Sequence, residues 1–244
     1  MTSNKITLSR DSIKYIAMVT MLLNHIAAVF LTRGTLIYEI FTDIGYFTAP
    51  CMLYFLVEGY EHTSSKRRYG TRLLVFALIS EIPFCLAFTE GTVISFVAMN
   101  MIYTLFICFL LLYVRENVQN KLIKGVLLLV LILATVMSDW SILAPLITLF
   151  FANSDGTYED NKTAFIKTVF LFGLFNFVNT DTPFTVQNIV HTLGTMVGPA
   201  LSATAILFFY NGGRSQRRSA VNKWFFYIFY PAHLLILGLL RVLI

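Results

Sequence analysis

The sequence is poor in charged residues. Asp, Glu, Lys and Arg make up 13% of its 244 residues, whereas about 25% is usual in a soluble globular domain. Hydrophobic residues account for 57%, and the mean hydropathy is +0.73. Apolar runs recur along the whole chain and leave no stretch for a separate soluble domain. The composition therefore predicts an integral membrane protein with one domain over residues 1–244.

Cysteine is also scarce. Cys51, Cys85 and Cys108 each lie inside an apolar run, where a cysteine is usually a small buried hydrophobic residue. The chain has no CxxC pair and no His/Cys cluster, so we predict neither a metal site nor a redox site. The net charge of +5 could suit a nucleic acid, but the basic residues alternate with the apolar runs. We therefore expect membrane lipids, and no nucleic acid, among the partners.

The apolar runs predict an all-α fold, a polytopic helical bundle with about nine transmembrane segments. The segments are 12–32, 37–57, 72–88, 94–114, 122–138, 141–151, 163–178, 188–210 and 224–243. The fifth and sixth are separated only by Ser138–Trp140, and the sixth is short. These two segments are either separate spans or a tilted or re-entrant pair.

Basic residues mark every second connection. If all nine segments cross the membrane, only Arg33 and Arg241 fall on the side opposite the N-terminus. The positive-inside rule then places the N-terminus in the cytoplasm and the C-terminus outside. If the sixth segment alone did not cross, every connection after it would lie on the opposite side of the membrane. The basic residues on the predicted cytoplasmic side are Lys5, Arg10, Lys14, Lys66, Arg67, Arg68, Arg72, Arg115, Lys121, Lys124, Lys162, Lys167, Arg214, Arg217, Arg218 and Lys223.

The first segment carries a histidine deep inside an apolar helix. Lys14 and His25 are eleven positions apart, close to three helical turns, so both project from nearly the same face. The interval rises by about 16 Å, which places His25 near the middle of a bilayer. A neutral imidazole at that depth can act as a general base or as an acyl-accepting nucleophile. The alternative is a structural hydrogen bond between helices.

The connection between residues 60 and 72 concentrates positive charge. Arg68 and Arg72 lie here beside His62, and arginine side chains of this kind can hold the phosphates of a cytosolic cofactor. Membrane topology alone also accounts for basic residues at this place. His233 follows Pro231 near the cytoplasmic start of the last segment, where it could line a cofactor entrance.

Other polar residues fall inside or beside the predicted spans. Each could line a polar interior or simply hydrogen-bond between helices. Glu39 and Asp43 are one helical turn apart on the extracytoplasmic half of the second span. With His25 they could also form the proton relay of a small transporter or flippase. The remaining members of this group are Glu58, Glu81, Asn100, Tyr103 and Asp139.

Three stretches together resemble the TraX family, which is named for the pilin acetylase of conjugative plasmids. They are IKYIAMVTMLLNHIAAVF, FLVEGYEHTSSKRRYGTRLLVFALISEIPF, and FFYNGGRS followed by FFYIFYPAHLLIL. The interval from Lys14 to His25 also resembles the basic-residue and histidine pattern of the broader transmembrane acyltransferase group. By matching position, the resemblance implies a catalytic His25. It implies motif positions at Lys14, Glu58, Gly59, His62, Thr63, Tyr69, Arg72, Glu81, Pro83, Asn211, Gly212, Pro231 and His233.

The resemblance implies an acyltransferase of the bacterial inner (cytoplasmic) membrane that uses acetyl-CoA as acyl donor. The expected acceptor is an amine or hydroxyl on a peptide, glycan or lipid, with N-acetylation as the best-known activity. We expect Lys14, Arg68, Arg72, His62 and His233 to contact the donor. One position departs from the pattern, because Asn24 stands where the family more often has an aspartate. A pilus assembly factor without catalysis is a further alternative.

Overall fold

The computed structural model describes residues 7–91, 94–180, 184–212 and 220–243. Across these ranges the regular structure is helical, as predicted, and the β-type pairing is confined to two isolated bridges. Lys5, Arg214, Arg217 and Arg218 of the predicted cytoplasmic set lie outside the described residues.

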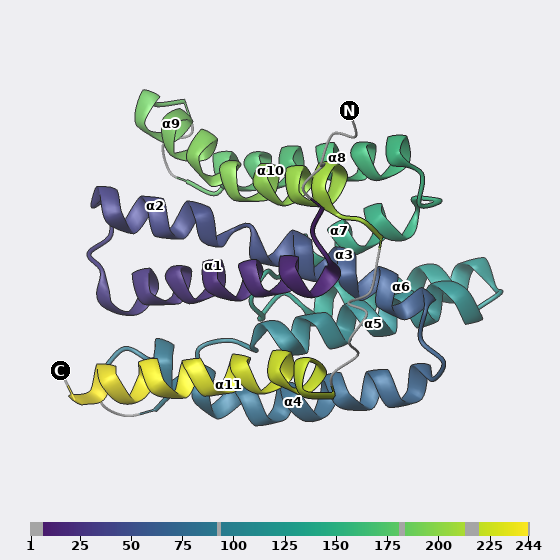
Figure 1. Cartoon of the computed structure of the whole chain (residues 1–244), viewed down its shortest axis with the longest axis horizontal. Coiled ribbons are helices and arrows are strands. Elements are labelled where there is room, and N and C mark those ends of the chain that lie inside the picture. Colours follow the sequence, from purple (N-terminus) through teal and green to yellow (C-terminus); the bar gives the residue numbers. More distant parts are fainter. Residues whose placement is uncertain (1–6, 92–93, 181–183, 213–219, 244) are drawn as a thin grey trace, which may run out of the picture. The chain divides into compact units, whose positions relative to one another are not determined.

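Every predicted apolar segment contains helix (Figure 1). Two of the segments are interrupted, the second between α2 and α3 and the eighth between α9 and α10. The helices are α1 (Arg10–Phe30), α2 (Leu36–Gly45), α3 (Thr48–Glu61), α4 (Lys66–Phe88), α5 (Met101–Asn117), α6 (Lys121–Ala134), α7 (Leu143–Ala152), α8 (Tyr158–Val178), α9 (Val186–Thr195), α10 (Val197–Thr204), the π-helix η1 (Ala205–Phe209) and α11 (Ala220–Leu243).

Most helices begin at a side chain that caps them. Ser, Thr and Asn oxygens accept hydrogen bonds from the first free backbone N–H groups, which have no partner inside the helix. Since each capping oxygen lies within three residues of the N–H group from which it accepts, these starts are encoded locally. The capping residues are Ser9, Thr35, Ser65, Asn100, Asn120, Thr157 and Thr185.

The predicted start of the fourth segment, residue 94, is wrong. Helix α5 begins seven residues later, at Met101, because Asn100 caps it: Asn100 Oδ1 accepts from the N–H groups of Ile102 and Tyr103. The preceding Met99 instead bridges to the α6–α7 connection, where its carbonyl accepts from the N–H of Asp139 at 2.8 Å. The apolar residues before Asn100 therefore lie outside the helix.

Five helical stretches among the described residues are long and apolar enough to cross a membrane. Several other helices are shorter than the roughly 20 residues that a perpendicular span needs: α5 has 17 residues, α6 has 14 and α7 has 10. The chain is therefore a multi-helix membrane protein, and nine crossings remain a prediction. The five stretches are Arg10–Phe30, Leu36–Glu61, Lys66–Phe88, Val186–Phe209 and Trp224–Leu243.

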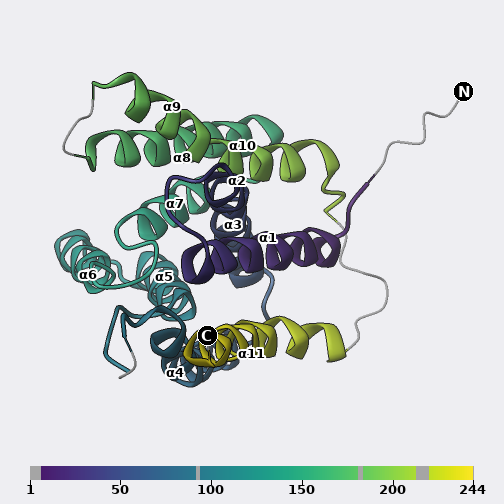
Figure 2. The same ribbon diagram turned by 90° about the vertical axis from the view of Figure 1, so that its left-hand side faces the viewer.

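The chain forms two compact units. The first comprises residues 1–27, 31–52 and 156–226. Within it α8 packs on both α9 and α10, and α2 packs on the same two helices (Figure 2). Tyr46 stacks edge-on against Phe172 of α8, with ring centroids 4.8 Å apart. This unit contains most of α1, and with it both Lys14 and His25.

The second unit comprises residues 28–30, 53–155 and 227–244. Helix α5 is its centre, since it contacts α4, α6 and α7. On α5, the ring of Phe109 is flanked edge-on by Tyr60 and Tyr69, each at 5.3 Å. Helix α11 runs beside α4, where a Cβ at Gly238 would come within 2.7 Å of Leu86. Figure 1 shows these two helices side by side.

Candidate functional site

Helix α1 carries the predicted catalytic histidine. The helix is unbroken from Arg10 to Phe30, so Lys14 and His25 project from one face as the sequence predicts. Met18 and Met21 lie between them on that face and are buried, and His25 itself is 7% exposed. Lys14 is only partly exposed, and its Nζ lies 5.1 Å from the centroid of the Phe226 ring.

Two polar contacts attach the neighbouring face of α1 to the rest of the first unit. The hydroxyl of Thr20 lies 3.0 Å from that of Thr48, and both donate to the carbonyl of Ala17. One turn further along, Asn24 Nδ2 donates to the carbonyl of Thr42 at 3.2 Å. These contacts attach the His25 region to the end of α2 and the start of α3.

Asn24 fills the space between α1 and the end of α2. Its side chain occupies the space that a Cβ at Gly45 would need. Its amide donates to the Thr42 carbonyl, which also accepts from the N–H of Tyr46 at the end of α2. An ionised aspartate at this position could not donate, and its oxygens would face the carbonyl oxygen of Thr42. The asparagine is therefore the residue type that this contact requires.

A second polar group in the first unit contains the predicted residues Glu39 and Asp43. Both project from α2, and His191 of α9 joins them with its Nε2 at 3.7 Å from Glu39 Oε2. Asp43 interacts electrostatically with both of these residues. Helix α9 approaches closely because Gly194 has no side chain: a Cβ there would lie 2.5 Å from Asp43 Oδ2. No sequence motif indicated a role for His191.

The predicted residue Glu81 finds its partner in the second unit. Asn100 donates to Glu81 Oε2 from its backbone N–H at 3.2 Å and from its side-chain Nδ2 at 2.6 Å. Nδ2 also lies 2.8 Å from the carbonyl of Ala77. Asn100 thus links the middle of α4 to the start of α5. Tyr103 does not join this group through its hydroxyl, which donates to the carbonyl of Ala134.

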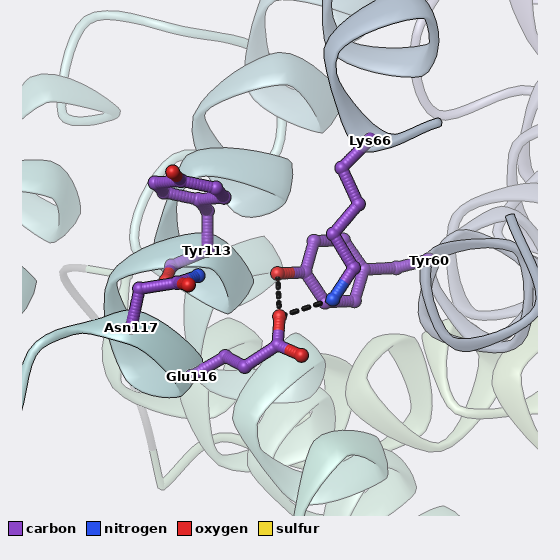
Figure 3. Close-up of polar contacts among 5 residues, drawn as sticks. All are labelled: Tyr60, Lys66, Tyr113, Glu116 and Asn117. Atoms are coloured by element: carbon purple, nitrogen blue, oxygen red, sulfur yellow. Dashed lines mark hydrogen bonds and ion pairs between the residues drawn. The ribbon is translucent and has the colours of Figure 1, made fainter. Parts of the chain in front are cut away.

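Lys66, at the start of α4, is occupied by a structural contact. Figure 3 shows its Nζ and the hydroxyl of Tyr60 converging on Glu116 Oε2, and both donate to that oxygen. The ammonium also lies 4.2 Å from the centroid of the Tyr60 ring. We call Tyr60, Lys66 and Glu116 the α3–α5 latch, because they join the α3–α4 connection to the end of α5. No sequence motif indicated Glu116.

The neighbouring predicted cations are differently placed. Arg68 is exposed, and so is His62, whose Nδ1 donates to the carbonyl of Glu58 at 2.8 Å. Arg72 is partly buried, lies 5.6 Å from the Tyr69 ring, and its Nε makes no hydrogen bond with any described residue. Arg68 and His62 thus present donors for an anionic ligand at the surface of the second unit, whereas Nε of Arg72 is buried.

His233 and Asp139, like the predicted Glu58 of α3, also belong to the second unit. His233 is 6% exposed, its ring stacks on Phe229 at 4.8 Å, and its Nδ1 donates to the Phe229 carbonyl at 2.7 Å. Asp139 lies between α6 and α7, where its carbonyl accepts from Thr104 Oγ1 at 2.7 Å. Within the described ranges, no group of three or more His, Cys, Asp or Glu residues could hold a metal ion.

Long apolar helices with polar side chains buried among them define a polytopic α-helical membrane protein. The chain belongs to the TraX protein family, which it matches over residues 9–241. It is 30% identical over 243 residues to the "Probable fimbrial assembly protein FimC, serogroup H1" of Dichelobacter nodosus, covering 96% of each chain. No solved structure matches the chain.

Proposed function

We propose that the chain is an acyltransferase that moves an acetyl group from acetyl-CoA to an amine acceptor during pilus assembly. The observation that carries this proposal is the buried His25 in α1, on the same helix face as Lys14. Membership of the TraX family and the name of the D. nodosus relative support the link to pili. A peptide amine is therefore the preferred acceptor, ahead of a glycan or lipid amine or a hydroxyl.

His25 takes the proton of the reacting amine in this proposal. The amine nitrogen attacks the thioester carbonyl, the carbon–sulfur bond breaks, and the coenzyme A thiolate leaves and is protonated. Transfer through an acetyl-histidine intermediate is the variant mechanism, in which the imidazole attacks the thioester first. An imidazole suits both routes, because its ring nitrogen can accept a proton or attack a carbonyl carbon.

Cationic side chains are proposed to bind the phosphates of acetyl-CoA. Arg68, Arg72 and His62, all in the second unit, are the candidates at or just before the start of α4. Lys14 lies in the first unit and His233 is buried, so contact of either one with the donor stays a prediction from the sequence. Lys66 is a weaker candidate, because Glu116 and Tyr60 already engage its ammonium. This assignment would place the adenine-phosphate end of the donor on the cytoplasmic side.

We propose the bacterial cytoplasmic membrane as the location, with the N-terminus inside and the C-terminus outside. The charge pattern supports nine segments, although α6 and α7 are short. Their lengths favour a pair of partial or tilted crossings over two perpendicular spans. Either arrangement returns the chain to the same side after α7.

The test is acetyl transfer by purified full-length protein. Protein in detergent is incubated with labelled acetyl-CoA and a membrane and secreted-peptide extract, and mass spectrometry detects the added acetyl group. We expect His25→Ala to reduce transfer by at least about 100-fold, as loss of a general base does. Glu159→Gln, an exposed change on α8, should retain wild-type transfer. Transfer at the wild-type rate by His25→Ala would contradict the proposal.

A non-catalytic assembly factor is the second candidate, and the name of the D. nodosus relative favours it. It predicts that pilus assembly in cells tolerates His25→Ala and Arg72→Ala, while larger packing changes abolish assembly. The acyltransferase proposal predicts that His25→Ala alone abolishes assembly wherever assembly depends on acetylation. Complementation of a deletion strain, with membrane protein levels measured in parallel, separates the two candidates.

A further inference from the structure

Two broken helices meet in the first unit. Helix α2 ends at Gly45 before α3 starts, and α9 ends at Thr195 before α10 starts. A Cβ at Gly198 would collide with the backbone of Asp43 and Phe47, so the start of α10 touches the α2–α3 break directly. Interrupted helices in membrane proteins commonly surround a ligand or ion site.

This junction carries excess negative charge. Glu39 and Asp43 each contribute one carboxylate, and neither forms an ion pair with a lysine or arginine among the described residues. Among the described residues, His191 is the sole cationic partner of the two carboxylates, and it balances at most one of their two charges. An uncompensated charge within a membrane segment is costly, and a bound cation removes that cost.

The junction is open at one end and closed at the other. The side chains of Glu39 and His191 are 33% and 46% exposed. Asp43 Oδ1, in contrast, is buried and accepts no hydrogen bond from any described residue. The next residue of α9, Thr192, is 8% exposed, and its Oγ1 likewise has no hydrogen-bond partner in the described chain. A ligand that donates several hydrogen bonds would satisfy the buried carboxylate oxygen.

We propose that Glu39 and Asp43 bind the ammonium group of the amine acceptor. An ammonium group supplies one positive charge and three donors, which matches one surplus negative charge and an unsatisfied carboxylate oxygen. Asn24, the residue before His25, donates to the carbonyl of Thr42, the residue before Asp43. The acceptor site is therefore joined to the His25 turn of α1 by one hydrogen bond. This inference rests on the acyltransferase proposal.

The test measures amine binding without catalysis. Purified full-length protein in detergent is melted with increasing phenylalaninamide, or with N-acetylphenylalaninamide, which has no ammonium group. We expect only phenylalaninamide to stabilise the wild type. Glu39→Gln and Asp43→Asn should each weaken its apparent affinity at least tenfold, and Glu159→Gln should leave it unchanged. Equal stabilisation by both compounds, unchanged affinity in both variants, or no stabilisation of the wild type would overturn the inference.

Two further arms separate the alternatives. In the first, thermal stability is measured in sodium chloride and in choline chloride at equal ionic strength. The amine site is overturned, and an alkali-cation site assigned, if sodium stabilises the wild type, the carboxylate variants lose that stabilisation, and phenylalaninamide stabilises none of the proteins. Gly194→Ala keeps both carboxylates but places a methyl group beside Asp43, so it should also weaken phenylalaninamide binding. If Asp43→Asn does not fold, Glu39→Gln and Gly194→Ala still decide the outcome.

Acetyl-CoA binding is measured on the same samples. The carboxylate variants should retain wild-type stabilisation by acetyl-CoA. If acetyl-CoA binds but phenylalaninamide does not, the amine site is overturned and the acyltransferase proposal stands. If phenylalaninamide binds through Glu39 and Asp43 while acetyl-CoA neither binds nor reacts, the amine site stands and the acyltransferase proposal fails.

Discussion

Asn24 and His25 are adjacent on α1 and have different partners. Asn24 faces the end of α2, where its amide donates to the carbonyl of Thr42. His25 lies about 100° further round the helix and is almost fully buried. The hydrogen bond of Asn24 sets how α1 lies against α2. The position of His25 therefore depends on Asn24, although the two side chains point in different directions.

We predict that Asn24→Asp lowers the stability of the folded protein. The substitution keeps the shape of the side chain, removes the donor to Thr42 and places a carboxylate beside a carbonyl oxygen, at a cost of about 1–3 kcal/mol. Thermal melting of purified protein at pH 8 should show a lower Tm. Melting at pH 5 should show a smaller loss, since a protonated aspartate can donate. Asn117→Asp, at an exposed helix end, is the control and should change the Tm less. An unchanged Tm for Asn24→Asp would contradict the importance of this contact.

At the scale of helices, glycines decide where two breaks can meet. Gly198 allows the start of α10 to touch the backbone between α2 and α3. Gly125 in α6, in contrast, has no atom within 4 Å of the position that a Cβ would take. Both glycines lie inside helices, and only Gly198 has backbone atoms packed against its Cβ position. Alanine substitutions at the two positions can therefore be compared directly.

We predict opposite effects for alanine at these two positions. Gly198→Ala should destabilise the protein by about 1–3 kcal/mol or more, because backbone atoms cannot yield as a flexible side chain can. Gly125→Ala should be neutral or stabilise by about 0.5–1 kcal/mol, as expected for an open position inside a helix. Thermal melting and the yield of monodisperse protein measure both effects. Equal stability of the two variants would contradict the close packing of α10 on α2.

The α3–α5 latch predicts a pH effect at one edge of the second unit. Glu116 lies beyond the predicted span 94–114, and the hydrogen bonds from Lys66 and then from Tyr60 lower the pKa of its carboxyl below 4.5. The ionised form is therefore favoured by folding. This stabilisation is complete above pH 4.5 and is lost as the pH falls through the lowered pKa. The Lys66 and Glu116 side chains are 30% and 49% exposed, so the contribution should be at most about 1 kcal/mol.

Glu116→Gln tests the latch. The variant should be slightly less stable than the wild type at pH 7, and the difference should shrink as the pH falls below 4.5. Glu61→Gln removes an exposed carboxylate at the end of α3 and should not change with pH in this way. Melting curves between pH 3.5 and pH 7 provide the measurement. A constant difference between Glu116→Gln and the wild type across this range would argue against the latch.

At the scale of the whole molecule, the order of membrane crossings can be measured directly. The cysteines Cys51, Cys85 and Cys108 are buried, so they should not react with a membrane-impermeant maleimide in cells. A single cysteine introduced at Thr32, Ser64 or Ser154 then shows on which side of the membrane that position lies. We expect labelling from outside at Thr32→Cys alone, with Ser64→Cys and Ser154→Cys labelled only after the membrane is opened. Outside labelling of Ser154→Cys would mean that α6 and α7 together make one crossing.

The class of protein, the approximate helices and the common face of Lys14 and His25 could all be predicted from the amino-acid sequence. These features depend on composition, on capping residues within one turn and on the helical period, all of which are local. The start of α5 was predicted too early because hydrophobicity does not reveal a capping asparagine. Three contacts became visible only in the folded chain: His191 with Glu39, Glu116 with Lys66 across 50 residues, and Asn24 with the carbonyl of Thr42. Such pairs depend on how helices pack, and packing depends on the shapes of many side chains at once.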